Sequence, residues 1–272
     1  MISGQDLRLE MVTAETEFDS VSFSPTAERV QLIGGRVQDG FGASGGTDIH
    51  IENVNAYDSG GIGWNNTTRL TIMNSTLTSG EYINTNAAGA EMRDTIFVGN
   101  DFAAQTNDNC APVCNASTVM KDIHSALFGY NCLKNRLDEA QRTWRFRGPN
   151  SNILLLKNIL IGRHSGNAVG GMLENVGGSS GDLTNIRYDG NHTWDDRPVN
   201  QSFMQLDQDS VVFVMTGIRF ANNVIHSGGA GTWSLMVNPP AGTLEYDDSD
   251  GNSYINEGAE FSYPACPYGA AH

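Results

Sequence analysis

A short motif recurs along most of this chain: an apolar residue, one or two variable positions, an Asn or Gly, a variable residue, then usually another apolar residue. Aligned on the Asn-like position, its copies fall at residues 35, 54, 75, 100, 135, 158, 191 and 223. The first steps are 19, 21 and 25 residues, which is the length of one coil of three strands and three turns. Later steps of 35, 23, 33 and 32 residues indicate inserted loops. The repeat therefore predicts a solenoid.

Asn and Gly suit such a repeat for two physical reasons. A coil bends sharply between strands, which requires a positive φ that both residues tolerate. Stacked Asn side chains also hydrogen-bond to one another along a ladder. We therefore predict an all-β fold, a right-handed parallel β-helix with inserted loops. A β-sandwich is the alternative, since it also uses many short strands.

The chain has 272 residues, a length that one domain accommodates. We expect residues 1–25 to form the first rung or an N-terminal cap, with strands near Leu7–Leu9 and Val21–Phe23. Pro239 and Pro240 interrupt the pattern, so residues 239–272 are expected to be a C-terminal cap or tail over the last rung.

The net charge is −15, with 31 acidic against 16 basic residues, which argues against nucleic acid and anionic membranes as partners. No run of about 18 apolar residues occurs, so no membrane span is expected. Residues 1–13 show no signal peptide. Cys110 and Cys114 form either a small disulfide loop or two unrelated thiols, and a disulfide would favour a secreted or periplasmic location.

Positive charge is concentrated in one part of this acidic sequence. Eight of the 16 basic residues fall within the 43 positions from Lys121 to Arg163. If residues 144–147 form a strand, Trp144 and Phe146 lie on one face while Arg145 and Arg147 lie on the other. The cluster either focuses an electrostatic field toward an anionic ligand or pairs with nearby acidic residues on an exposed face.

The rung pattern between Val30 and Ile225 resembles the pectate-lyase-like superfamily of right-handed β-helices, which implies a carbohydrate-active protein. Residues 121–162 resemble polysaccharide lyase family 6, which includes alginate lyases and chondroitinase B. The resemblance lies in Arg145–Ile153 followed by Lys157-Asn158, an Arg-containing strand and a further Asn rung. It implies a Lys base and an Arg acid on neighbouring rungs, although Ile123–Leu127 lacks the family's Lys-bearing strand motif.

These observations predict a polysaccharide lyase that cleaves a uronic-acid polymer by β-elimination. Such a reaction needs a base, an acid and a cation beside the substrate carboxylate. The candidate catalytic residues are Lys121, His124, Tyr130, Arg142 and Arg145. The candidate substrate-binding residues are Lys134, Arg136, Arg147, Lys157, Arg163, His164 and Trp194.

Two other functions and one cofactor stay open. The chain is alternatively a non-catalytic glycan-binding, adhesin or tail-type module, or a glycoside hydrolase that pairs Asp189 with Asp195 or Asp196. Residues 247–252 resemble half of a calcium loop, although an acidic surface turn is the favoured interpretation. The acidic residues around Trp194 are a second place for calcium. No metal ligand is assigned, and the oligomeric state is not predicted.

Overall fold

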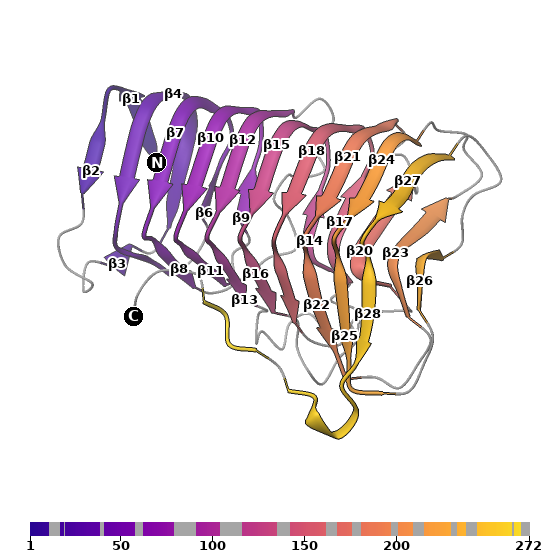
Figure 1. The fold of residues 1–272 in the computed structure, drawn as a ribbon. Coiled ribbons are helices and arrows are strands. Elements are labelled where there is room, and N and C mark those ends of the chain that lie inside the picture. Colours follow the sequence, from indigo (N-terminus) through magenta and orange to yellow (C-terminus); the bar gives the residue numbers. More distant parts are fainter. Residues whose placement is uncertain are drawn as a thin grey trace.

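The protein is a solenoid of stacked parallel strands in the computed structural model (Figure 1). It describes residues 1–10, 17–18, 20–38, 41–57, 62–78, 91–103, 116–134, 142–161, 168–175, 181–196, 201–208, 215–229, 233–237, 244–262 and 264–267. The described strand pairs are parallel, with partners about one coil apart in the sequence. The prediction of an all-β, right-handed parallel β-helix is confirmed, and a β-sandwich is excluded because its sheets are antiparallel.

Three sheets run along the solenoid. Sheet A contains β1 (Ile2–Gln5), β2 (Arg8–Glu10), β4 (Val21–Ile33), β6 (Phe41–Ala43), β7 (Gly46–Glu52), β9 (Ile62–Trp64), β10 (Thr67–Met73), β12 (Met92–Val98), β15 (Ile123–Gly129), β18 (Asn150–Leu156), β21 (Leu183–Asp189), β24 (Met215–Ala221) and β27 (Leu244–Asp250). Sheet B contains β3 (Glu17–Phe18), β5 (Arg36–Val37), β8 (Asn55–Tyr57), β11 (Thr76–Thr78), β13 (Asp101–Ala103), β16 (Cys132–Lys134), β19 (Ile159–Ile161), β22 (His192–Asp195), β25 (Val224–Ser227) and β28 (Ser253–Asn256). Sheet C contains β14 (Ala116–Met120), β17 (Arg142–Arg147), β20 (Ala168–Asn175), β23 (Gln201–Gln208) and β26 (Trp233–Val237).

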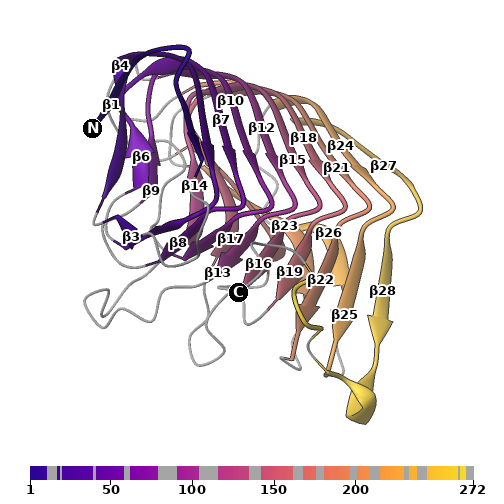
Figure 2. The ribbon, with the colours of Figure 1, turned by 90° about the vertical axis from the view of Figure 1, so that its left-hand side faces the viewer.

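A two-residue corner joins each sheet-A strand from β4 onward to its sheet-B strand, apart from the short β6 and β9 (Figure 2). The second corner residue is the Asn-like position of the sequence repeat. Strand register aligns residues 35, 54, 75, 100, 158, 191 and 223, as the repeat predicts. One position differs: the slot assigned to residue 135 belongs to Asn131, because Cys132 pairs with Asp101 and Ile159. Asn252 occupies the same slot in the following coil.

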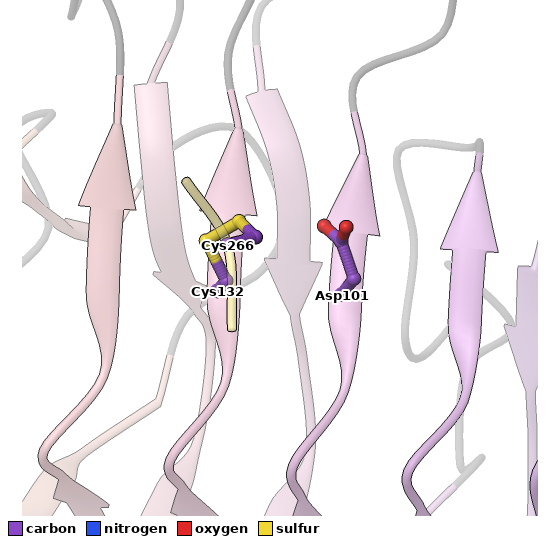
Figure 3. A group of neighbouring side chains, drawn as sticks. All are labelled: Asp101, Cys132 and Cys266. Carbon is purple, nitrogen blue, oxygen red and sulfur yellow. A yellow bond between two sulfur atoms is a disulfide. The ribbon is translucent and has the colours of Figure 1, made fainter. Parts of the chain in front are cut away.

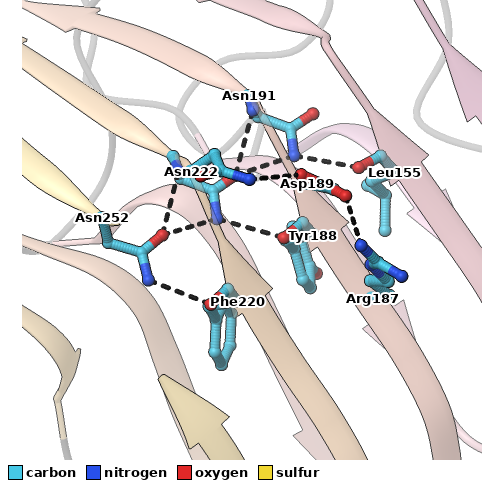
Figure 4. A network of polar contacts seen from close by, with 9 residues as sticks. Leu155, Arg187, Tyr188, Asp189, Asn191, Phe220, Asn222 and Asn252 are labelled. Atoms are coloured by element: carbon cyan, nitrogen blue, oxygen red, sulfur yellow. Dashed lines mark hydrogen bonds and ion pairs between the residues drawn. The ribbon is translucent and has the colours of Figure 1, made fainter. Parts of the chain in front are cut away.

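The predicted asparagine ladder runs through this corner from Asn100 to Asn252. Within it, Asn158 Nδ2 donates to Asn191 Oδ1 at 2.9 Å and to the Phe128 carbonyl at 2.8 Å. Asn158 Oδ1 accepts from the backbone N–H and the Nδ2 of Asn131, at 3.0 and 3.1 Å. The same pattern repeats towards Asn252, and Figure 4 shows its last steps. Each ladder amide therefore joins neighbouring coils and satisfies buried backbone groups.

The positive φ that the bend requires lies one residue earlier than the repeat suggested. Asn53, Asn74, Gly99, Tyr130, Lys157, Gly190, Asn222 and Gly251 have φ between 49° and 72°. The ladder asparagines themselves do not adopt this conformation. Asn therefore recurs in the slot because of its hydrogen bonds, and the bend depends on the residue before it.

A second row of left-handed residues crosses the middle of sheet A. In β10 it is Arg69, with φ of 55°, which comes before buried Leu70 and Ile72. The extra residue shifts the alternation, so the first, fourth and sixth residues of these strands face the interior. The N-terminal part of the row alternates in charge: Asp6 pairs with Arg29, and Asp48 pairs with Arg69. The Arg29 guanidinium lowers the pKa of the Asp6 carboxyl.

The interior is a continuous column of apolar side chains from all three sheets. Phe97 stacks on Phe128 with ring centroids 5.1 Å apart, and Tyr188 stacks on Phe220 at 5.2 Å. Trp144 from sheet C is fully buried against Phe128. Rungs bury their apolar faces against their neighbours, as a repeat architecture requires.

Both ends of the chain continue the coil pattern. β1 and β2 pair with β4, so the first residues belong to a rung. β27 and β28 pair with β24 and β25 and form the last rung. The predicted acidic turn at residues 247–252 is wrong, because residues 247–250 belong to β27, Gly251 makes the bend and Asn252 ends the ladder. Across the described ranges, no helical segment has the length and apolar character to cross a membrane.

A C-terminal tail leaves the last rung and returns along the outside of sheet B. It begins with the 3₁₀ turn η2 (Gly258–Glu260). Phe261 lies against Gly228, where an added Cβ would meet the Phe261 ring at 3.0 Å. Cys266 forms a disulfide with Cys132 of β16, with Cα atoms 5.7 Å apart, beside Asp101 of the neighbouring strand (Figure 3). This disulfide was not predicted, and Cys110 and Cys114 lie outside the described residues.

Candidate active site

Two adjacent strands of sheet B present a group of rings on their outer face. In β22 and β25, Thr193, Asp195, Ile225 and Ser227 are buried, so the alternate residues face outward. Those residues include His192, Trp194 and His226. Trp194 and His226 are register partners, and their rings are parallel within 2° with centroids 4.3 Å apart. The indole therefore fixes the orientation of the His226 ring.

A chain of hydrogen bonds links these rings to a carboxylate. His226 Nδ1 lies 2.7 Å from Glu257 Oε1, and His226 Nε2 lies 3.1 Å from His192 Nδ1. A carboxylate accepts hydrogen bonds, so His226 carries its proton on Nδ1 and its Nε2 accepts from His192 Nδ1–H. This tautomer leaves the lone pair of His192 on Nε2. We call His192, His226 and Glu257 the histidine relay.

The electrostatic surroundings of the histidine relay favour the neutral form of the His192 imidazole. Partial burial lowers the pKa of His192, and a positive charge on His226 lowers it further whenever that ring is protonated. The lowered pKa favours the neutral His192 ring, which carries its proton on Nδ1 and a lone pair on Nε2. Glu257 is placed by the last rung, where its backbone N–H donates to the Ser227 carbonyl at 2.9 Å. Such an arrangement suits a general base whose partner ring is oriented by a carboxylate.

The predicted site residues lie on all three faces of the solenoid. Lys121 and His124 lie at or near the start of β15, where His124 Nδ1 is 2.8 Å from Ser151 Oγ. Lys134 is in sheet B, and Arg142, Arg145 and Arg147 are in strand β17 of sheet C. Trp144 and Phe146 of that strand share one face, as predicted, and that face is the interior one. Arg136, Arg163 and His164 lie outside the described residues.

Three of the predicted residues fall on or beside the A-to-B corner and the outer face of sheet B. Tyr130 and Lys157 occupy the first corner position of consecutive coils, with Lys157 Nζ 5.7 Å from the Tyr130 ring centroid. Trp194 belongs to the ring group beside the histidine relay. Of the carboxylates in the hydrolase alternative, Asp195 is buried inside, while Asp189 ends a sheet-A strand and pairs with Arg187 (Figure 4). Asp196 directly follows β22 in sheet B and is partly buried.

The sequence prediction did not include His192, His226 or Glu257. The positions of the ladder asparagines would have indicated that these three residues lie on one surface. Counted from the ladder asparagines 191, 223 and 252, these residues stand at offsets of one, three and five. Odd offsets in sheet B face outward in these coils, so aligning coils on the ladder places the three on one surface.

One group among the described residues brings three potential metal-ligand atoms, a carboxylate oxygen and two sulfurs, within 4.8 Å of one another: Asp101, Cys132 and Cys266. Both sulfurs are joined in the disulfide, so neither offers the thiolate that a metal would bind. This cluster is therefore the disulfide that attaches the tail to β16, with Asp101 beside it.

The fold places the chain in the class of right-handed parallel β-helices, and that class hosts several unrelated functions. Comparison with models of known protein families gives no match, and comparison with curated proteins gives none either.

Proposed function

We propose that this protein is a polysaccharide lyase that cleaves an acidic polysaccharide by β-elimination, with His192 as the base. The observation that carries the proposal is the hydrogen-bonded relay from Glu257 through His226 to His192 on an outward face of the solenoid. The rigid ladder beneath these strands holds the rings in place, as a preorganised site requires.

The reaction uses the residues in a simple order. His192 Nε2 removes the proton from the sugar carbon that bears the carboxylate. The electrons of that C–H bond form a double bond to the next carbon, and the glycosidic oxygen leaves with the bonding pair. That oxygen receives the proton from the His192 imidazolium, directly or relayed through a water molecule, so His192 is regenerated and neither an oxidant nor water is consumed. The products are an unsaturated sugar and a new chain end.

Glu257 and His226 assist by stabilising the protonated state of His192. As His192 gains a proton at Nε2, its Nδ1–H bond to His226 strengthens, and the Glu257 carboxylate stabilises the positive charge shared by the rings. Trp194 keeps the His226 ring from rotating. A secreted or periplasmic location is part of the proposal, and it is supported by the Cys132–Cys266 disulfide.

Changing the base is expected to abolish turnover. The purified protein is screened against alginate, pectate and chondroitin for product absorbance in the ultraviolet. On a polymer that is cleaved, His192→Ala should lower kcat at least about 100-fold, the usual contribution of a general base. His50→Ala is the matched control, because His50 also lies beside a glutamate, 3.3 Å from Glu52, on a different face.

The screen separates the alternatives. Reducing ends without ultraviolet absorbance would identify a hydrolase instead. Binding with no product from any polymer would leave a glycan-binding module, and equal losses in both histidine variants would remove the relay from catalysis.

The pH dependence of kcat/KM provides a second prediction. The ordinary pKa of an imidazole is about 6.5, and that of His192 is lowered. The base should therefore stay active below pH values of about 6.5, and activity should fall only as the pH drops through the lowered pKa. Glu257→Gln removes a negative charge that favours imidazolium, so it should shift this acid limb to still lower pH and reduce kcat about 10-fold. An acid limb that stays in place in Glu257→Gln would contradict the relay.

A further inference from the structure

Two consecutive coils place bulky residues where the corner disfavours them. The first corner residue adopts a positive φ, which Asn and Gly tolerate and larger side chains resist. Tyr130 has φ of 54° and Lys157 has φ of 50°, whereas the neighbouring coils use Gly99 and Gly190. Backbone strain of this kind persists at positions where the side chain has a use.

The two side chains form an exposed cation beside an aromatic ring. Tyr130 is 40% exposed, Lys157 is exposed, and the Lys157 ammonium lies 5.7 Å from the Tyr130 ring centroid. Gly190, in the next coil, leaves room for the Lys157 stem, since an added Cβ would lie 3.2 Å from Lys157 Cγ. Among the described residues, no carboxylate forms an ion pair with Lys157.

This pair adjoins the histidine relay along the solenoid axis. Lys157 lies one coil before Gly190, and Gly190 precedes His192 by two residues. Coils of a β-helix repeat every 4.7–4.9 Å or so, the spacing of neighbouring strands. A sugar residue in a polysaccharide has a similar length, so a polymer lying along the corner would meet one coil with each sugar.

We propose that Tyr130 and Lys157 form a subsite for the anionic group of a sugar in a polysaccharide that runs along this corner toward His192. The Lys157 ammonium binds the carboxylate or sulfate, and the Tyr130 ring contacts the sugar face. The subsite deepens the proposed function and rests on it for the polymer's direction. The affinity of the subsite for an oligosaccharide is measurable without turnover, so the subsite proposal and the lyase proposal can fail separately.

The test replaces each residue by the one that the corner prefers. Tyr130→Asn and Lys157→Asn should each raise the Tm by about 2–4 °C, because the backbone strain is relieved. Lys157→Asn should weaken binding of carboxylated oligosaccharides from pectate or alginate about 10-fold, while binding of neutral cello-oligosaccharides is unchanged. Binding of a sulfated oligosaccharide is measured in parallel. The oligosaccharide that loses more affinity in Lys157→Asn identifies whether the subsite binds a carboxylate or a sulfate.

Asn53→Lys is the matched control, because it puts an ammonium at the same corner position far from the relay. It should lower the Tm without tightening binding to either anionic glycan. Unchanged affinity for both anionic glycans in Lys157→Asn would overturn the subsite, whether the Tm rises or falls. Lost affinity in a protein that releases no product would keep the subsite and reject the lyase.

Discussion

Asn158→Ala is expected to lower the free energy of unfolding by about 3–5 kcal/mol, because it leaves several buried groups unsatisfied. The backbone N–H and one side-chain N–H of Asn131 lose their acceptor, and the Phe128 carbonyl loses its donor. Water does not reach these groups, since Asn131 and Phe128 are fully buried. The loss would appear as a lower denaturation midpoint in urea.

Asn55→Ala is the control for the ladder prediction. Asn55 lies in β8 at the start of a sheet-B strand, one residue beyond the ladder slot, and is only partly buried. Its replacement should change stability by less than about 0.5 kcal/mol. Equal midpoints for the two variants would show that the ladder contributes no net stability.

Cys266→Ser is expected to have the second large effect, a loss of about 2–5 kcal/mol. The Cys132–Cys266 disulfide closes a separation of 134 residues, and a long closed loop restricts the unfolded chain strongly. It also holds the tail across the sheet-B strands of the coils between β16 and β28. Thermal unfolding of the oxidised proteins measures the difference.

Reduction supplies the control for this prediction. Dithiothreitol should lower the Tm of the wild-type protein toward that of Cys266→Ser and should affect the variant much less. If the variant unfolds at the wild-type temperature before reduction, the tail closure does not stabilise the solenoid.

The fold followed from the sequence because one slot in each coil repeats the same chemistry. The alignment erred at residue 135, since Leu133-Lys134-Asn135 matches the apolar-x-Asn motif as well as the stretch before Asn131 does. Register decides for Asn131, and register depends on pairing with coils that lie far away in the sequence. Local patterns alone do not contain that information.

The site was harder to predict because neighbours in space are about one coil apart in the chain. The basic residues between 121 and 163 cluster in sequence, yet those that the structure describes are spread over sheets A, B and C. His192 and His226 are 34 residues apart, and neither lies in a recognisable catalytic motif. Trp194 was predicted as a substrate-binding residue, and its stacking partner His226 emerges only once β22 and β25 are paired.

The coils differ in length, but the A-to-B corner does not contribute to the difference. Register-aligned positions in successive sheet-A strands are separated by 21, 25, 31, 27, 33 and 32 residues, counted along Thr47, Thr68, Arg93, His124, Ser151, Thr184 and Thr216. In contrast, every corner that joins one of these strands to sheet B has two residues. All the variation therefore enters between a sheet-B strand and the next sheet-A strand. An extra residue at one corner would displace the ladder amide of that coil and break its bonds to the neighbouring coils, while an extra segment elsewhere leaves the ladder in register. The protein thus offers a scaffold in which loops can be lengthened or exchanged on one side while the opposite edge stays fixed.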